Sequence, residues 1–150
     1  MRTVLFTIVQ LTWGILQSFA GLVVYLLGSF VKPIHRVSTG RYRSAICVEW
    51  ENSGGLSLGL FIFVPRNPSE GILVHEYGHC IQSLILGPLY LPLVGVPSLL
   101  WAGHPKARAY RVEKHVSYYH PFQEHNANVL GERVTGRHAP ESRRKTTSMR

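Results

Sequence analysis

The longest apolar stretch of the chain lies at its start. Residues 3–31 contain no charged side chain, and most of them are aliphatic or aromatic. A membrane-spanning helix needs about 20 such residues, and this run is too long for a signal-peptide core and has no clear cleavage site. We therefore predict that residues 1–31 form one retained, membrane-embedded hydrophobic helix. The alternative is a buried helix of a globular fold, because polar residues such as Gln10 and Gln17 interrupt the run.

Residues 43–50 and 57–64 have the β-branched and aromatic character of strands, and residues 51–55 between them have the composition of a turn. We predict that the two strands form a hairpin. Residues 57–63 would then be an edge strand that can pair with the backbone of an extended peptide. The alternative is a hairpin that only covers the core.

A helix is predicted over residues 68–86. Asn67 can cap its N-terminus, Pro68 suits the first turn, and Glu70 completes a capping box, whereas Gly87-Pro88 ends the helix. Apolar residues flank the centre of this segment on both sides. We therefore expect the middle of the helix to be buried.

A second apolar stretch, residues 84–101, is interrupted by Gly87-Pro88, Pro92, Gly95 and Pro97. These breaks argue against one straight spanning helix. We predict instead a hydrophobic loop, or a short re-entrant or interfacial segment, that packs on the preceding helix. Plain core packing is the alternative.

The centre of the predicted helix reads His75-Glu76-Tyr77-Gly78-His79. Positions i and i+4 share a helix face, so both imidazoles can present a ring nitrogen to one tetrahedral cation at about 2.0 to 2.1 Å. Glu76 is rotated by about 100° from His75, and it can accept a proton from a metal-bound water and later pass it to a leaving amine. Two solvated surface histidines are the alternative, but burying these groups in apolar surroundings is costly without a metal. The pattern predicts a zincin, a zinc metallopeptidase in which Glu76 is the general base.

Catalytic zinc sites commonly have three protein ligands, so a third donor is expected. The downstream candidates are His104, Glu113, His115, His120, Glu124, His125, Glu132 and His138. We choose Glu124, on a short helix that Pro121 opens and Gly131 closes. Asn128 lies one turn later on the same face and can accept a hydrogen bond from a ligand imidazole. His120 and His125 remain alternatives, and on a solvated helix face Glu124 would be no ligand at all.

Composition excludes several other kinds of site. All eight acidic residues are Glu, so the chain has no aspartic-protease dyad, EF-hand loop or Ser-His-Asp triad. The two cysteines, Cys47 and Cys80, do not form a disulfide framework, and Cys80 is expected to point away from the metal ligands. The sequence contains no glycine-rich phosphate loop and no dinucleotide fingerprint.

The net charge of +8 comes mainly from a cluster after the first apolar run and from the C-terminal part of the chain. Lys32, Arg36, Arg41 and Arg43 follow the run and predict a cytoplasmic location for the domain after it. Residues 137–150 are predicted to be a disordered basic tail. No nucleic-acid recognition motif accompanies these charges, so anionic lipid headgroups are the expected partner and nucleic acid is not.

The run from His75 to Leu91, with residues 95–101 after it, resembles a family of small bacterial proteins, and related segments occur in the C-terminal regions of some Rhs-repeat proteins. The resemblance covers roughly residues 10–131. It includes an upstream Gly-Gly-x-Ser-Leu-Gly strand, matched by residues 54–59, and a later Glu-x-x-Ala-Asn element, matched by residues 124–128. Members are generally assigned as zinc metallopeptidases, so the resemblance implies that reaction and favours Glu124 as a ligand. Phe122-Gln123 departs from the aromatic and Thr or Pro that often precede this Glu.

Together these features predict an α+β, zincin-like minimal fold. Its parts are a hydrophobic helix (1–31), a metallopeptidase domain (32–136) with the hairpin, the active-site helix and a C-terminal ligand-bearing helix, and the tail. The expected function is zinc-dependent hydrolysis of a peptide or protein substrate at the bacterial inner membrane. The candidates for stabilising the oxyanion are Tyr110, His115, Tyr118 and Tyr119. The alternative is a non-catalytic membrane or scaffold protein with a structural or vestigial metal site, and the Rhs resemblance suggests a toxin or immunity role as a variant.

Overall fold

The computed structural model describes residues 3–140 and has the predicted α+β class. Within this range the elements are α1 (Thr3–Thr12), α2 (Ile15–Leu27), β1 (Arg36–Tyr42), β2 (Ala45–Trp50), β3 (Leu56–Leu58), β4 (Phe61–Pro65), α3 (Glu70–Leu86), α4 (Val96–Gly103), α5 (Pro105–Glu113) and α6 (Phe122–Thr135). Two 3₁₀ turns, Lys32–Ile34 and Gly87–Leu89, and a π-helix, Leu91–Gly95, link some of them. Of the predicted disordered tail 137–150, residues 141–150 lie outside the described residues. The prediction is wrong for its start, because Ala139 is buried and its amide donates to Glu132 Oε1 at 2.8 Å.

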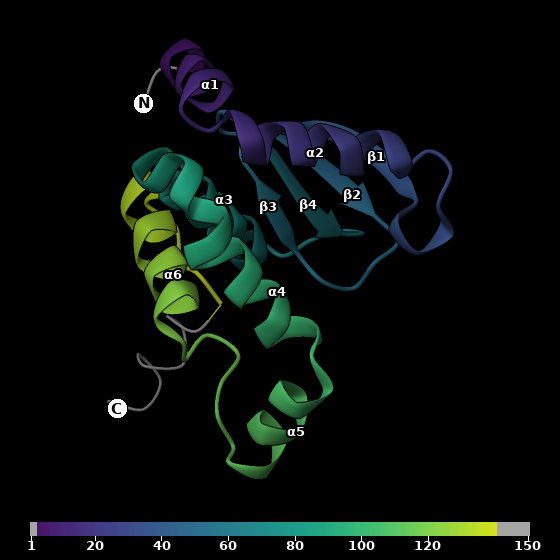
Figure 1. Cartoon of the computed structure of the whole chain (residues 1–150), viewed down its shortest axis with the longest axis vertical. Coiled ribbons are helices and arrows are strands. Elements are labelled where there is room, and N and C mark those ends of the chain that lie inside the picture. The colour runs from purple at the N-terminus through teal and green to yellow at the C-terminus, as the bar shows by residue number, and fades with distance from the viewer. Residues whose placement is uncertain (1–2, 141–150) are drawn as a thin grey trace.

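Helices cover both faces of the sheet, as Figure 1 shows for α2, which runs across the strands, and for α3 and α6, which lie side by side. Strand β4 is apolar throughout because its two faces are both buried. Phe61 and Phe63 pack in the cluster that includes Val24 of α2. Ile62, between them, packs with Tyr77 of α3 in the other cluster. The sheet is therefore the middle layer, and α3 lies on one side of it.

The strands do not pair as predicted. The order in the sheet is β1-β2-β4-β3, with β2 and β4 parallel and both outer pairs antiparallel. The predicted hairpin between residues 43–50 and 57–64 is wrong, because Gly59 (φ 62°) turns the chain between β3 and β4 and makes a separate hairpin there. Of the predicted edge strand 57–63, only its first residues lie at the edge, in β3. Strand β1 was not predicted, since its side chains are mostly polar and exposed.

Helix α3 has the predicted buried centre and the predicted end, but its start differs. Ser69, not Asn67, is the capping residue, and its hydroxyl accepts a hydrogen bond from the Ile72 amide at 3.4 Å. Asn67 has a positive φ of 51° and belongs to the preceding turn. The helix ends at Gly87, whose φ of 54° suits glycine. The central turns, including His75 and His79, are buried.

Two glycines set the close crossing of α3 and α6. A Cβ on Gly78 of α3 would overlap the Ala127 carbonyl of α6, and a Cβ on Gly131 of α6 would overlap the Val74 carbonyl of α3. The prediction that Gly131 ends the last helix is therefore wrong. The helix continues to Thr135 and is closed by Gly136 in the left-handed conformation (φ 69°). Gly131 is needed inside the helix for this contact, which brings the α6 side chains next to those of α3.

The N-terminal apolar run forms two helices, so the predicted single helix over residues 1–31 is wrong. The axes of α1 and α2 differ by 96°, with the break at residues 13–14. Within the described residues, neither helix alone has the length and apolar character for a membrane crossing, although the bent pair meets those criteria jointly. The bend turns Gln10 and Gln17 toward α3, where both are fully buried.

The second apolar stretch is helical rather than a loop. The π-helix Leu91–Gly95 continues directly into α4. Pro92 and Pro97 do not break it, because each lies in the first turn of its helical segment, where the backbone amide that proline lacks has no required partner. The segment packs against the preceding helix through the turn Gly87–Leu89.

Candidate metal centre

Three side chains from the two crossing helices converge on one buried point. His75 and His79 lie one turn apart on α3, and Glu124 lies in the first turn of α6. Glu124 Oε2 is 3.2 Å from His75 Nε2 and 3.5 Å from His79 Nε2. One donor atom from each residue lies within 4.8 Å of the others, and all three residues are buried. The structure thus brings together the three predicted ligands.

Each imidazole is oriented by a side-chain amide on its far nitrogen. His75 Nδ1 donates to Asn128 Oδ1 at 2.7 Å, and this is the role predicted for Asn128. His79 Nδ1 donates to Gln82 Oε1 at 2.7 Å. Gln82 was not predicted, although its position three residues after His79 on the same helix face is a usable signal. The Gln82 side-chain nitrogen donates to the Gln123 carbonyl at 2.8 Å. This bond keeps the Gln82 side-chain oxygen directed toward the His79 ring.

The cluster leaves both carboxylate oxygens of Glu124 without a hydrogen-bond donor among the described residues. Each ring carries its proton on Nδ1, so in a neutral imidazole Nε2 has a lone pair and no proton. The Nε2 lone pairs of both rings then face the Glu124 carboxylate, which is also a hydrogen-bond acceptor. Both Glu124 oxygens are buried, and no described residue donates a well-directed hydrogen bond to them. Such buried acceptors are costly unless protons on the rings or a metal ion lie among them.

The pKa values of His79 and Glu124 are shifted because these groups lie close together. Burial by itself would lower the pKa of His79, but the neighbouring carboxylates of Glu124 and Glu76 raise it above its ordinary value. Burial would also raise the pKa of Glu124, yet the His75 and His79 rings hold it well below its usual range. Glu124 is therefore ionised at neutral pH, as a metal ligand must be.

The spacing of the donors fits a tetrahedral metal. Two ligands at about 2.0 to 2.1 Å from one ion, at a tetrahedral angle, are roughly 3.3 Å apart. The two nitrogen-to-oxygen distances, 3.2 and 3.5 Å, lie on either side of that value. Two imidazole nitrogens and one carboxylate oxygen are also a donor set that several divalent metals accept. This buried group can therefore hold a metal ion.

Glu76 lies beside the three donors and is held by the edge strand. The Ser57 hydroxyl is 2.6 Å from Glu76 Oε2 and 2.8 Å from the Glu76 carbonyl, and both oxygens share its one proton. A Cβ on Gly55 would overlap the Glu76 carboxylate, so this close approach requires glycine. Tyr90 supports the arrangement by donating to the Ser57 carbonyl at 2.9 Å. The Gly-Gly-x-Ser segment of the sequence thus contacts Glu76.

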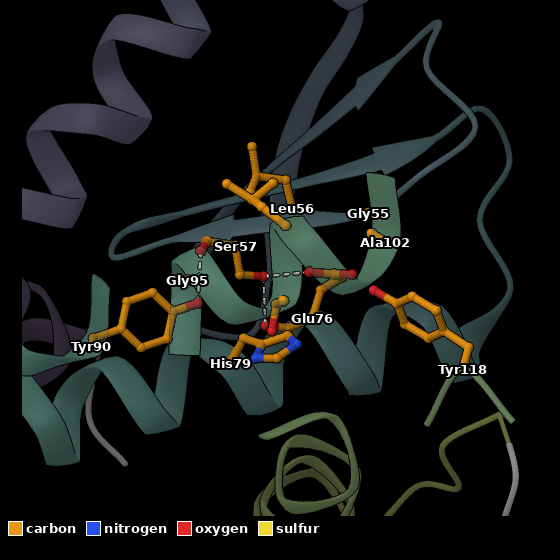
Figure 2. A pocket seen from close by; sticks show the side chains of 11 residues that line it. Gly55, Leu56, Ser57, Glu76, His79, Tyr90, Gly95, Ala102 and Tyr118 are labelled. Atoms are coloured by element: carbon orange, nitrogen blue, oxygen red, sulfur yellow. Dashed lines mark hydrogen bonds between the residues drawn. The ribbon is translucent and has the colours of Figure 1, made fainter. Parts of the chain in front are cut away.

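Tyr118 faces Glu76 across the site. Figure 2 shows its hydroxyl pointing toward the Glu76 carboxylate, with the His79 ring nearby. The Trp101 ring nitrogen donates to the Tyr118 carbonyl at 2.8 Å, and the Arg111 guanidinium lies 5.5 Å from the centre of the Tyr118 ring. Burial, with the charges of Glu124 and Glu76, raises the pKa of Tyr118, so its phenol stays protonated. It is therefore a hydrogen-bond donor over the whole neutral range.

A groove of about 590 Å³ leads to this point. Its lining includes His75 and Glu76 from α3, Gly55 and Leu56 beside them, and Arg108 and Arg111 from α5. The Tyr119 ring also lines it and packs edge-on against His75, with 5.0 Å between ring centres.

The remaining predicted candidates lie elsewhere. His120 and His125, the alternative ligands, are exposed, and neither belongs to the buried donor group. Tyr110 and His115 are exposed and do not line the groove. Cys80 is buried next to His79 but is not part of the donor group, as predicted.

No family model, curated protein or solved structure matches the chain. The resemblance to the small bacterial family stays a prediction.

Proposed function

We propose that this protein is a zincin-like, zinc-dependent hydrolase of peptide bonds. The observation that supports the proposal best is the convergence of His75, His79 and Glu124, with Glu76 beside them on the floor of an open groove. Two histidines and one glutamate form a common ligand set of catalytic zinc sites. Leu56 of the edge strand β3 lines the groove together with Gly54 and Gly55 of the preceding turn.

The protein residues have separate roles in this proposal. His75, His79 and Glu124 would hold the ion, and Asn128 and Gln82 would keep the rings in the ligating tautomer. A bound zinc ion would lower the pKa of water and polarise the scissile carbonyl. Glu76 would accept the proton of the attacking water and deliver it to the leaving amine. The Ser57 hydroxyl holds Glu76 Oε2, and Gly55 leaves the space that the carboxylate occupies.

Tyr118 is the residue we assign to the developing oxyanion. A donor for that charge must be protonated and must reach the site from the side opposite the base. Tyr118 meets the first condition because its pKa is raised, and the second because it points across the cavity toward Glu76. Among the four predicted candidates, Tyr119 is the next closest, but it packs against the His75 ring.

The test is Glu76→Gln, with Glu113→Gln as the matched control on exposed α5. Zinc content is measured first, and cleavage of casein and of membrane-derived peptides by the zinc-loaded protein is measured second. We expect Glu76→Gln to keep its zinc and to lose about 10²- to 10⁴-fold in rate, as for removal of a general base. The control should cleave like the unaltered protein. Equal rates for both variants would contradict the proposal.

A structural metal site is the competing account, and the complete burial of Glu124 favours it. Zinc binding at one ion per chain without cleavage of any substrate would support this account, because a purely structural site does not need Glu76 or the groove.

A further inference from the structure

Helices α1 and α2 have their polarity reversed relative to an ordinary surface helix. Gln10 and Gln17 are fully buried, whereas Phe19 is 65% exposed and Phe30, just beyond α2, is 86% exposed. Among the described residues, 14 of the 26 exposed large hydrophobic side chains fall within residues 4–31. Surface helices in water show the opposite pattern, with the apolar side inward.

The buried polar groups of these helices form hydrogen bonds with α3 and the turn after it. The Gln10 amide donates to the Cys80 carbonyl at 3.2 Å and accepts from the Ser83 hydroxyl at 2.9 Å. The Gln17 amide donates to Ser83 Oγ at 2.8 Å and to the Gly87 carbonyl at 3.0 Å. Polar contacts between helices, with apolar side chains outward, are the arrangement expected of helices that contact lipid.

The exposed apolar side chains extend from the helices onto the neighbouring turn. Trp13, at the break between α1 and α2, packs directly on Gly87. Near this contact the chain exposes Ile85, Leu89 and Leu93, each by more than half. We call the outward side chains of α1 and α2, with these three residues, the apolar face. It contains most of the exposed large hydrophobic side chains among the described residues, whereas such side chains on soluble monomers are usually scattered or confined to patches of a few hundred Å².

We infer that the apolar face is covered by a lipid bilayer. It carries no charge between Thr3 and Val31, whereas protein interfaces keep polar and charged groups at their rim. Cations begin where the apolar residues end, at Lys32 and at Arg36, which donates to Ser29 and lies 4.1 Å from the centre of the Tyr25 ring. A charge-free surface bordered by cations complements hydrocarbon bordered by anionic headgroups.

The inference goes beyond hydrolysis, because it does not depend on the metal or on Glu76. It also places α3 next to the membrane, because Gln10 and Gln17 make hydrogen bonds to this helix. The first of these bonds ends on the carbonyl of Cys80, the residue after His79.

The experiment is flotation of the purified full chain with phosphatidylcholine vesicles, with and without phosphatidylglycerol, at low and high salt. Phe19→Glu is compared with Val112→Glu, an equally apolar and exposed position on α5. Neither side chain is buried, so both variants should fold, which circular dichroism checks. We expect the unaltered chain and Val112→Glu to float, also at high salt, and Phe19→Glu to lose about tenfold or more in partitioning.

Three results would overturn the inference. One is an unaltered chain that stays monodisperse and lipid-free beside vesicles. Another is flotation of Phe19→Glu at the level of Val112→Glu. The third is a dimer in lipid-free buffer that Phe19→Glu dissociates, since a second copy of the chain would then cover the apolar face.

Discussion

The α1–α2 pair and the α3–α6 pair both bury polar side chains, but they do so in different ways. In the first, amide donors meet acceptors: Gln10 and Gln17 donate to oxygens of α3 and the following turn. In the second, two imidazoles and the Glu124 carboxylate meet with no well-directed hydrogen bond between them. Among the described side chains of the first region only Gln17 Oε1 lacks a partner, whereas in the second both oxygens of a carboxylate lack one beside two imidazoles that can share a metal ion. The contrast separates a structural contact from a binding site within one small fold.

The largest effect should follow removal of a convergent donor. Glu124→Ala is expected to weaken zinc affinity by well over 100-fold, which exceeds the loss of about 10- to 100-fold that is usual for residues supporting a ligand. Glu113→Ala, an exposed carboxylate on α5, is the control and should bind as before. Competition with a chelating dye measures both affinities. If Glu124→Ala and Glu113→Ala bound zinc with equal affinity, the α3–α6 pair would not be a metal-binding site.

A smaller loss is expected when the ring partners are changed. Asn128→Leu and Gln82→Leu each remove the acceptor for one Nδ1 proton, so the ring is no longer held with Nε2 toward the site. We expect zinc affinity to fall by about 10- to 100-fold for each variant. Isothermal titration with zinc gives the two values. If either variant bound zinc as tightly as the unaltered protein, that amide would have no orienting role.

The first helix pair should respond in stability but not in metal binding. Gln10→Leu leaves the Cys80 carbonyl and the Ser83 hydroxyl without this partner, at a cost of about 1 to 3 kcal/mol. Leu11→Ala, at an exposed position, should change stability by about 0.5 kcal/mol or less. Chemical denaturation in detergent measures both, with and without zinc. A loss of stability that appeared only with zinc present would mean that the two regions are not separate.

The smallest expected effect is the change of protein stability with pH. It distinguishes ring protons from a metal ion as the positive charge among His75, His79 and Glu124. Because the pKa of His79 is raised, its contribution to stability is complete below about pH 6.5 and is lost as the pH rises through the higher folded-state value. The metal-free protein should therefore lose stability as the pH rises above about 6.5. Zinc competes with protons for the ring, so its stabilisation should grow over the same interval. Melting temperatures with and without zinc should diverge with pH, and parallel curves would contradict this.

The sequence predicted the ligands better than the sheet. Helix periodicity paired His75 with His79 and Glu124 with Asn128, and the resemblance favoured Glu124 among the downstream candidates. In the structure these four side chains lie together. The pairing of β2 with β4 was missed, since parallel pairing depends on contacts between distant segments and leaves no local signal. Gly131 was misread as a helix end, because a glycine required by a close crossing looks the same in sequence as one required by a turn.

The N-terminal run shows a further limit. Its composition predicted a single helix, but the chain bends at residues 13–14, and Gln10 and Gln17 on either side of the bend make hydrogen bonds to α3. In the sequence these glutamines only interrupt an apolar pattern. Gln82 and Ser57 were missed for a similar reason, because their importance comes from the partner that each meets in space.

The most direct test is X-ray diffraction from crystals grown with zinc, recorded on both sides of the zinc absorption edge. We predict one fully occupied anomalous peak between α3 and α6, about 2.0 to 2.1 Å from His75 Nε2, His79 Nε2 and a Glu124 oxygen. Crystals that show zinc only at other positions, with Glu124 turned away from both rings, would contradict the account.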